Sequence, residues 1–196
     1  MVASAAILLG ARGVKATSFT AILGDSKAPR GSIYHHFPKG KGQLVREALA
    51  RTSEQILAYQ RSCTADTAAG IVDHFVELFH RSLTDSECRA GCPVAGVVID
   101  TYADRGPFQE IARECFRSWT TLLAEQFVAV GLSRPAARSL SVTTLASIEG
   151  ALLLCRAEGS VAPLDLIAQH LRSWTSSPRP SRRRRPRASE EWVRGR

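Results

Sequence analysis

The segment 28–39 carries side chains suited to contact with nucleic acid. Arg30 has a guanidinium that can pair with a guanine edge or a phosphate, and Ser32 can donate a hydrogen bond to either. Gly31 lies between them and, having no side chain, permits close approach of the backbone. These residue types in this order predict a surface that binds duplex DNA. The further phosphate donors in the same segment are Tyr34 and His35.

Two short helices are expected to hold these side chains. Thr17 or Ser18 caps the first, which runs to about Gly24, and the second spans about 29–35 after a tight turn. This is a helix-turn-helix arrangement, whose second helix enters the major groove. A long helix follows from about residue 41, where N–H groups and cations can bind another phosphate. The predicted DNA contacts are Thr17, Ser18, Thr20, Lys27, Pro29, Arg30, Gly31, Ser32, Tyr34, His35, Lys39 and Lys41.

Helical periodicity dominates the rest of the chain, and no alternating run that would indicate a strand persists. Pro and Gly stand at the starts and ends of the periodic segments, in the order that helix caps favour. The sequence therefore predicts an all-α fold of about nine helices. Their expected ranges are about 3–12, 17–24, 29–35, 41–62, 67–83, 93–102, 107–130, 135–157 and 163–174.

The net charge of +8 is unevenly distributed. Residues 1–62 hold nine Lys and Arg against three Asp and Glu, whereas residues 63–175 hold nine against thirteen. The basic N-terminal part, called the head below, is followed by an acidic part, called the body. This pattern indicates that the head is the part that binds polyanions. We expect a helix-turn-helix domain over 1–42 and a ligand-binding and dimerisation domain over 43–175. The arginine-rich tail 176–196 buries too little apolar surface to fold and is expected to be disordered.

The N-terminal third resembles the tetracycline-repressor (TetR) family. The resemblance rests on Ala16-Thr17-Ser18, Ile22 and the run Gly31-Ser32-Ile33-Tyr34-His35-His36-Phe37, while Pro38-Lys39-Gly40-Lys41 resembles the YxaF/LmrA-like branch. It implies that the matching tyrosine and exit lysine contact the DNA backbone and that residues opening the recognition helix face bases. Lys27 departs from the family, which usually has Gly in that turn; a non-Gly residue there costs on the order of 1 kcal/mol.

Downstream, Gly91-Cys92-Pro93, Trp119 and 148–154 resemble the effector domain of the same branch. The resemblance implies a homodimer on a palindromic operator, formed by the last two long helices. It also implies repression that a small-molecule effector releases. The expected interface residues are Leu140, Leu145, Leu152 and Leu166. The expected helix 135–157, which carries the first three, is apolar on most of its sides.

Aromatic residues with a few polar tips are typical of an effector cavity. A carboxylate inside an apolar helix, as at Glu149, needs a partner, which is an effector, Arg156 or a helix end. Each predicted pocket residue has the alternative of being ordinary core, and the apolar helix that of being central in a monomer. The predicted pocket residues are Phe75, Phe79, Val98, Tyr102, Phe116, Trp119, Leu123 and Glu149.

Other functions find little support in the sequence. Five cysteines form an odd set within helical patterns, and a thiol or metal pair at Cys88 and Cys92 lacks further ligands nearby. No nucleophile, base and orienting group come together, so we expect neither an enzyme nor a cofactor nor a metal. The apolar start has no basic residue ahead of it, unlike a signal peptide, and no run reaches membrane-spanning length, so a cytoplasmic protein without a membrane partner is expected.

Two alternatives remain at this stage. One is an all-α small-molecule-binding protein or enzyme whose basic head is incidental. The other is non-specific nucleic-acid binding through the arginine tail.

Overall fold

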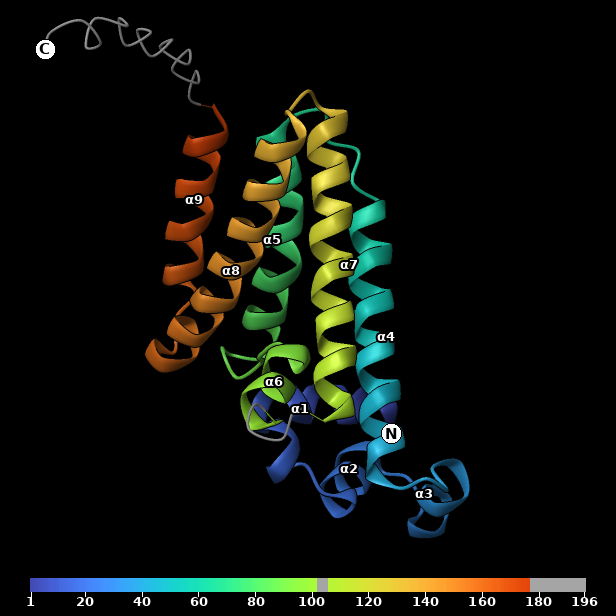
Figure 1. The fold of residues 1–196 in the computed structure, drawn as a ribbon. Helices are drawn as coiled ribbons and strands as arrows, with labels where there is room; N and C mark the ends of the chain where they lie inside the picture. The colour runs from blue at the N-terminus through green and yellow to red at the C-terminus, as the bar shows by residue number, and fades with distance from the viewer. Residues whose placement is uncertain (102–105, 177–196) are drawn as a thin grey trace, which may run out of the picture.

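A computed structural model describes residues 1–101 and 106–176 of the chain. These residues form nine α-helices and no strand, which confirms the predicted all-α fold (Figure 1). The expected ranges match closely. The helices are α1 (Val2–Ala16), α2 (Phe19–Ser26), α3 (Arg30–His36), α4 (Lys41–Arg61), α5 (Ala68–Asp85), α6 (Pro93–Thr101), α7 (Pro107–Ala129), α8 (Arg134–Glu158) and α9 (Ala162–Ser176).

The residues at the helix ends have side chains or backbone preferences that favour the start or the end of a helix. Ser18 is the N-cap of α2, and its Oγ accepts a hydrogen bond from the Ala21 N–H at 3.1 Å. Thr67 caps α5 in the same way, through the Gly70 N–H at 3.1 Å. Pro107 occupies the first turn of α7, and Gly159 ends α8 in the left-handed conformation. Side-chain caps of this kind satisfy N–H groups that a helix leaves without an internal partner.

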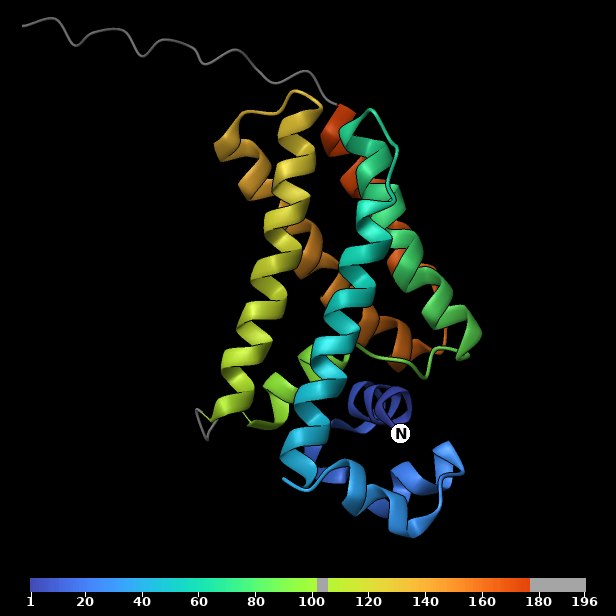
Figure 2. The same ribbon diagram turned by 90° about the vertical axis from the view of Figure 1, so that its right-hand side faces the viewer.

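The long helices form a bundle, and the short N-terminal helices lie at one end of it. In Figures 1 and 2, α4, α5, α7, α8 and α9 make up the bundle, α1 crosses beneath it, and α2 and α3 hang below α1. The bundle core is filled by large, fully buried side chains, among them Phe75, Trp119 and Phe127. α4 begins beside α3 and continues into the bundle, so one rigid helix belongs to both parts.

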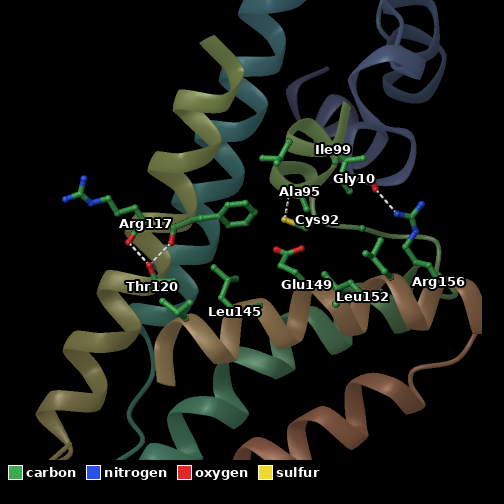
Figure 3. A pocket seen from close by; sticks show the side chains of 18 residues that line it. Gly10, Cys92, Ala95, Ile99, Arg117, Thr120, Leu145, Glu149, Leu152 and Arg156 are labelled. Atoms are coloured by element: carbon green, nitrogen blue, oxygen red, sulfur yellow. Dashed lines mark hydrogen bonds between the residues drawn. The ribbon is translucent and has the colours of Figure 1, made fainter. Parts of the chain in front are cut away.

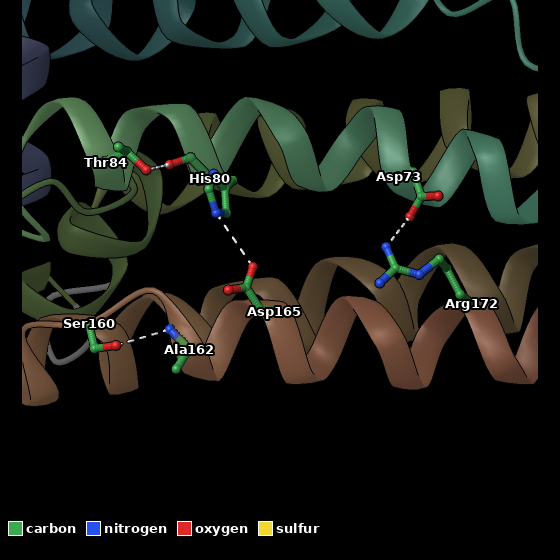
Figure 4. A network of polar contacts seen from close by, with 7 residues as sticks. All are labelled: Asp73, His80, Thr84, Ser160, Ala162, Asp165 and Arg172. Atoms are coloured by element: carbon green, nitrogen blue, oxygen red, sulfur yellow. Dashed lines mark hydrogen bonds and ion pairs between the residues drawn. The ribbon is translucent and has the colours of Figure 1, made fainter.

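α9 is held along the bundle by polar pairs to α5 as well as by apolar packing. Arg172 Nη1 donates to Asp73 Oδ1 at 2.8 Å, and His80 Nε2 lies 3.4 Å from Asp165 Oδ1 (Figure 4). All four side chains are partly exposed, so each pair contributes little to stability. Their role is to fix the position of α9 along α5.

α8 alone among the described helices is long and apolar enough, by length and composition, to cross a membrane. In this fold it packs against α5, α7 and α9. Buried residues such as Ile148 and Ala151 make it a core helix of the bundle.

α1 and the segment that opens α6 approach each other at backbone distance. A Cβ placed on Gly10 would lie 2.1 Å from the Gly91 carbonyl oxygen, and one on Gly96 would lie 2.4 Å from the Leu9 carbonyl oxygen. Only glycine fits at these two positions, because main-chain atoms face them and cannot rotate away as a side chain can. This glycine contact sets how the head meets the body.

Replacing Gly10 by alanine is expected to destabilise the protein by about 2 kcal/mol or more, as overpacking against a fixed backbone does. Gly24→Ala in α2 is the matched control, since no atom lies within 4 Å of its added Cβ. That control should gain about 0.5–1 kcal/mol from helix propensity. Urea unfolding of both variants measures this, and equal effects of the two substitutions would contradict the close contact.

Candidate DNA-binding surface and effector pocket

The turn between α2 and α3 fixes the angle of the two helices. Lys27 ends α2 with φ 54° and ψ 24°, the left-handed conformation that glycine adopts more readily. Pro29 follows in extended conformation as the N-cap of α3. Beneath the turn, Ile22, Ile33 and Phe37 are buried, and they lock α2 and α3 together. The predicted helix-turn-helix geometry is therefore present.

One side of this unit is exposed to solvent. Arg30, Gly31 and His35 on α3 are exposed, and nothing lies within 4 Å of a Cβ built on Gly31. Tyr34 is 71% exposed, and its ring meets the edge of Phe19 at a centroid distance of 6.0 Å. Phe19 therefore supports the tyrosine ring while leaving its hydroxyl accessible. The other exposed residues of the predicted DNA surface are Ser18, Thr20, Lys27, Pro29 and Lys39.

Besides the capping residue Ser18, three predicted DNA contacts donate side-chain hydrogen bonds within the protein. Thr17 is 1% exposed and donates through its hydroxyl to the Gly13 carbonyl at 2.6 Å, so its side chain is withdrawn from the surface. Ser32 donates its hydroxyl to the Pro29 carbonyl at 2.6 Å, which leaves its oxygen as an acceptor. Lys41 Nζ donates to the Val14 carbonyl at 2.5 Å. Burial lowers the pKa of Lys41, and Asp100 partly opposes this shift.

The C-terminal part of α1 receives polar contacts from the body. The helix is interrupted at Gly13, where φ is 73°, and the freed Lys15 N–H donates to Asp100 Oδ2 of α6 at 2.9 Å. From α8, Arg156 donates to the Gly10 carbonyl at 3.2 Å and to the Ala11 carbonyl at 2.8 Å. α1 is thus hydrogen-bonded to α6 and α8, and it also packs against α6.

A cavity of about 610 Å³ lies between α6, α7 and α8 (Figure 3). Of the predicted pocket residues, Val98, Phe116 and Glu149 line it. Leu145 and Leu152, predicted for a dimer interface, also line it. Arg156 forms part of the same wall, so the residue that bonds to α1 borders the cavity.

The other predicted pocket residues lie elsewhere. Phe75, Trp119 and Leu123 are fully buried in the bundle core, and Trp119 Nε1 donates to Ser53 Oγ at 3.1 Å. Phe79 lines a separate cavity of about 250 Å³ between α1, α4 and α5. Tyr102 lies outside the described residues. Helical periodicity identifies inward-facing residues but does not separate those that fill the core from those that border a cavity.

Two family models match the chain. Residues 2–48 match the description "Bacterial regulatory proteins, tetR family", and residues 68–170 match "Transcriptional regulator LmrA/YxaF-like, C-terminal domain". The second match alone spans more than half of the chain. The chain belongs to the TetR family of transcriptional regulators.

Relatives and solved structures agree with this assignment. An uncharacterized HTH-type transcriptional regulator of Mycobacterium tuberculosis is 34% identical, over 94% of this chain and 96% of its own. The HTH-type transcriptional regulator LmrA of Bacillus subtilis is 30% identical, over 84% and 88%. A TetR regulator from Legionella pneumophila superposes with a TM-score of 0.79 at 21% identity, covering 89% of this chain and 94% of that one.

In this TetR-family regulator, Glu149 is the only carboxylate on the cavity wall among the described residues. Burial raises its pKa to about 7, and its nearest polar neighbour is Cys92, at the start of α6. The Cys92 thiol is itself buried, which raises its own pKa well above the ordinary value and keeps it protonated. Within the described part of the chain, no cluster of His, Cys, Asp and Glu is placed to hold a metal ion.

Exposed apolar side chains gather on α8 and α9. Leu140, Leu145 and Leu152 of the predicted interface are at most 7% exposed and face inward, whereas Leu166 is 66% exposed. The three α8 leucines of the predicted interface therefore lie on the inner face of that helix, which is apolar on both faces. The other exposed apolar residues of α8 and α9 are Val142, Leu153, Leu154 and Trp174.

Lys27→Gly is expected to stabilise the protein by about 1 kcal/mol, because glycine adopts the left-handed conformation without steric cost. Lys27→Ala, which removes the same charge and keeps the Cβ, is the matched control and should give no such gain. Thermal unfolding of both variants measures the difference. A gain of the same size in the alanine variant would assign the effect to charge.

Glu149→Gln is expected to abolish one pH-dependent component of stability. The folded-state pKa of Glu149 is raised from 4.5 to about 7, so the folded protein holds a proton that the unfolded chain releases. The difference in free energy of unfolding, wild type minus variant, should fall by about 3 kcal/mol as the pH rises from 4 to 8. Urea unfolding of both proteins across this range tests it; a pH-independent difference would contradict the raised pKa.

Proposed function

We propose that this regulator reads a palindromic operator through α3, as a homodimer, and represses transcription until an effector enters the α6–α8 cavity. The observation that carries the DNA-reading part is the exposed face of α3, which presents Arg30, Tyr34 and His35 to solvent. Arginine pairs with the edge of guanine, and tyrosine and histidine donate to phosphates. The proposed contacts are Ser18, Thr20, Lys27, Pro29, Arg30, Gly31, Ser32, Tyr34, His35 and Lys39.

The proposed dimer forms through α8 and α9. Their exposed apolar residues Leu153, Leu154 and Leu166 are of the type that a second copy would cover. A two-fold dimer presents two copies of α3 to successive half-sites, which is why a palindrome is expected. The division into a head over 1–42 and a body over 43–175 follows from the same proposal.

The proposed effector acts by linkage. A ligand that binds the cavity better when the two heads are wrongly spaced lowers operator affinity by its differential affinity for the two states. Arg156 supports this route, because it borders the cavity and bonds to α1. The proposed function requires neither a cofactor nor a membrane. A regulator of this kind is expected in the cytoplasm, where it meets its DNA.

The experiment is selection of genomic DNA fragments at moderate salt with competitor DNA, by the intact protein and by residues 1–175. Both should enrich one palindromic site. Arg30→Ala and Tyr34→Ala should each weaken binding to it by about tenfold or more, as loss of a base or phosphate contact does. Arg61→Ala is the charge-matched control, since Arg61 is exposed at the far end of α4.

The alternative functions give different results. If only the intact protein binds, without sequence preference, the arginine tail is the DNA contact. If neither protein binds duplex DNA, the basic head is incidental, and the body belongs to a small-molecule-binding protein or an enzyme. Either outcome contradicts the proposed function.

A further inference from the structure

Among the residues that the structure describes, the α6–α8 cavity combines apolar walls with one carboxyl group. Its walls are formed by aliphatic and aromatic side chains, of which Val98, Phe116 and Leu145 come from three different helices. Glu149 projects from α8 toward Cys92 (Figure 3). A volume of about 610 Å³ suits a drug-sized molecule, and most of the contact such a molecule makes here is apolar.

The Glu149 carboxyl lacks a full set of partners within the protein. Its Oε1 is buried and accepts no hydrogen bond, and the side-chain partner of the carboxyl group is the Cys92 thiol, a weak donor. A buried carboxyl in this state carries a desolvation cost that a ligand with a suitable donor can remove.

The two arginines of the cavity do not fill this role. Arg156 uses Nη1 and Nη2 on the carbonyl oxygens of Gly10 and Ala11. Arg117 is exposed, and Figure 3 shows its guanidinium directed away from Glu149. None of the ion pairs among the described residues includes Glu149. The partner that the sequence left open is therefore neither Arg156 nor Arg117.

We propose that the effector is an apolar molecule that carries a protonated amine and places this amine against Glu149. An ammonium group supplies a positive charge and the hydrogen-bond donors that Oε1 lacks as partners. The attraction between an ammonium and a carboxylate is strongest in an apolar surrounding. An anionic head group would meet the Glu149 carboxylate at the same depth and be repelled. This inference rests on the proposed function, since it names the ligand class of the same cavity.

Three probes with one apolar body and different heads test the proposal: 4-phenylbutylamine, 4-phenylbutanol and 4-phenylbutanoate. Calorimetric titration of the full-length protein at pH 8 should give at least tenfold tighter binding for the amine than for the carboxylate, with the alcohol between them. Amine affinity should fall as the pH is lowered below about 7, because Glu149 gains a proton. Within the described ranges, the other titratable groups facing the cavity are Cys92, Arg117 and Arg156.

Two variants separate charge recognition from general apolar binding. Glu149→Gln should reduce the amine-to-carboxylate preference to less than threefold and leave the affinity for the alcohol within threefold of wild type. Arg117→Gln is the control at the cavity rim and should keep the amine preference. Unfolding curves of each variant confirm that the fold is intact.

Each other outcome overturns the proposal. Equal or tighter binding of the carboxylate, an amine preference that survives Glu149→Gln, or failure of all three probes to bind would each do so. These results are independent of DNA. If operator selection succeeds and the amine preference fails, the ligand class alone is wrong; if the amine preference holds and no operator is selected, the proposed function is wrong.

Discussion

The backbone contact between α1 and the start of α6 determines how the head of this regulator sits on its body. Gly10, Gly91 and Gly96 let main-chain atoms meet where any side chain would separate them. Because interfaces packed at this distance tolerate little intermediate displacement, α1 moves with α6 or loses the contact. α2 follows α1 in the chain and packs against it, and α3 packs against α2, so the position of the recognition helix depends on this contact.

The polar contacts around α1 extend this connection to the cavity. Asp100 of α6 binds the Lys15 N–H, Lys41 of α4 binds the Val14 carbonyl, and Arg156 of α8 binds two carbonyls further back. The side chain of Lys41 thereby ties α4 to α1, whereas its residue type had indicated a phosphate contact. Arg156 is the member of this group that borders the cavity. A ligand that displaces it would alter the contacts that hold α1, which gives the proposed linkage a physical route.

The sequence predicted the fold and the helix-turn-helix because both are encoded locally. Caps such as Ser18 and breaks such as Gly159 act within a few residues. The left-handed conformation of Lys27 is expected from the family resemblance, because that family usually has Gly in this turn. The cavity depends on distant helices. Periodicity marks Phe75 and Leu145 alike as apolar positions of helices, but it does not show that Phe75 fills the core and that Leu145 borders the cavity. The Gly10–Gly91 contact joins segments far apart in the chain, and no local signal marks glycines that meet across such a distance.

The most direct test of this account is the dissociation constant of Arg156→Met for the selected operator. Methionine keeps an apolar stem for packing but removes both hydrogen bonds to α1. If the cavity wall holds the head in place through α1, the variant should stay folded and change its operator affinity by about tenfold or more, an effect of about 1.4 kcal/mol. Arg81→Met on α5, an exposed arginine paired with Glu77, is the control. An operator affinity of Arg156→Met equal to that of wild type would contradict the account.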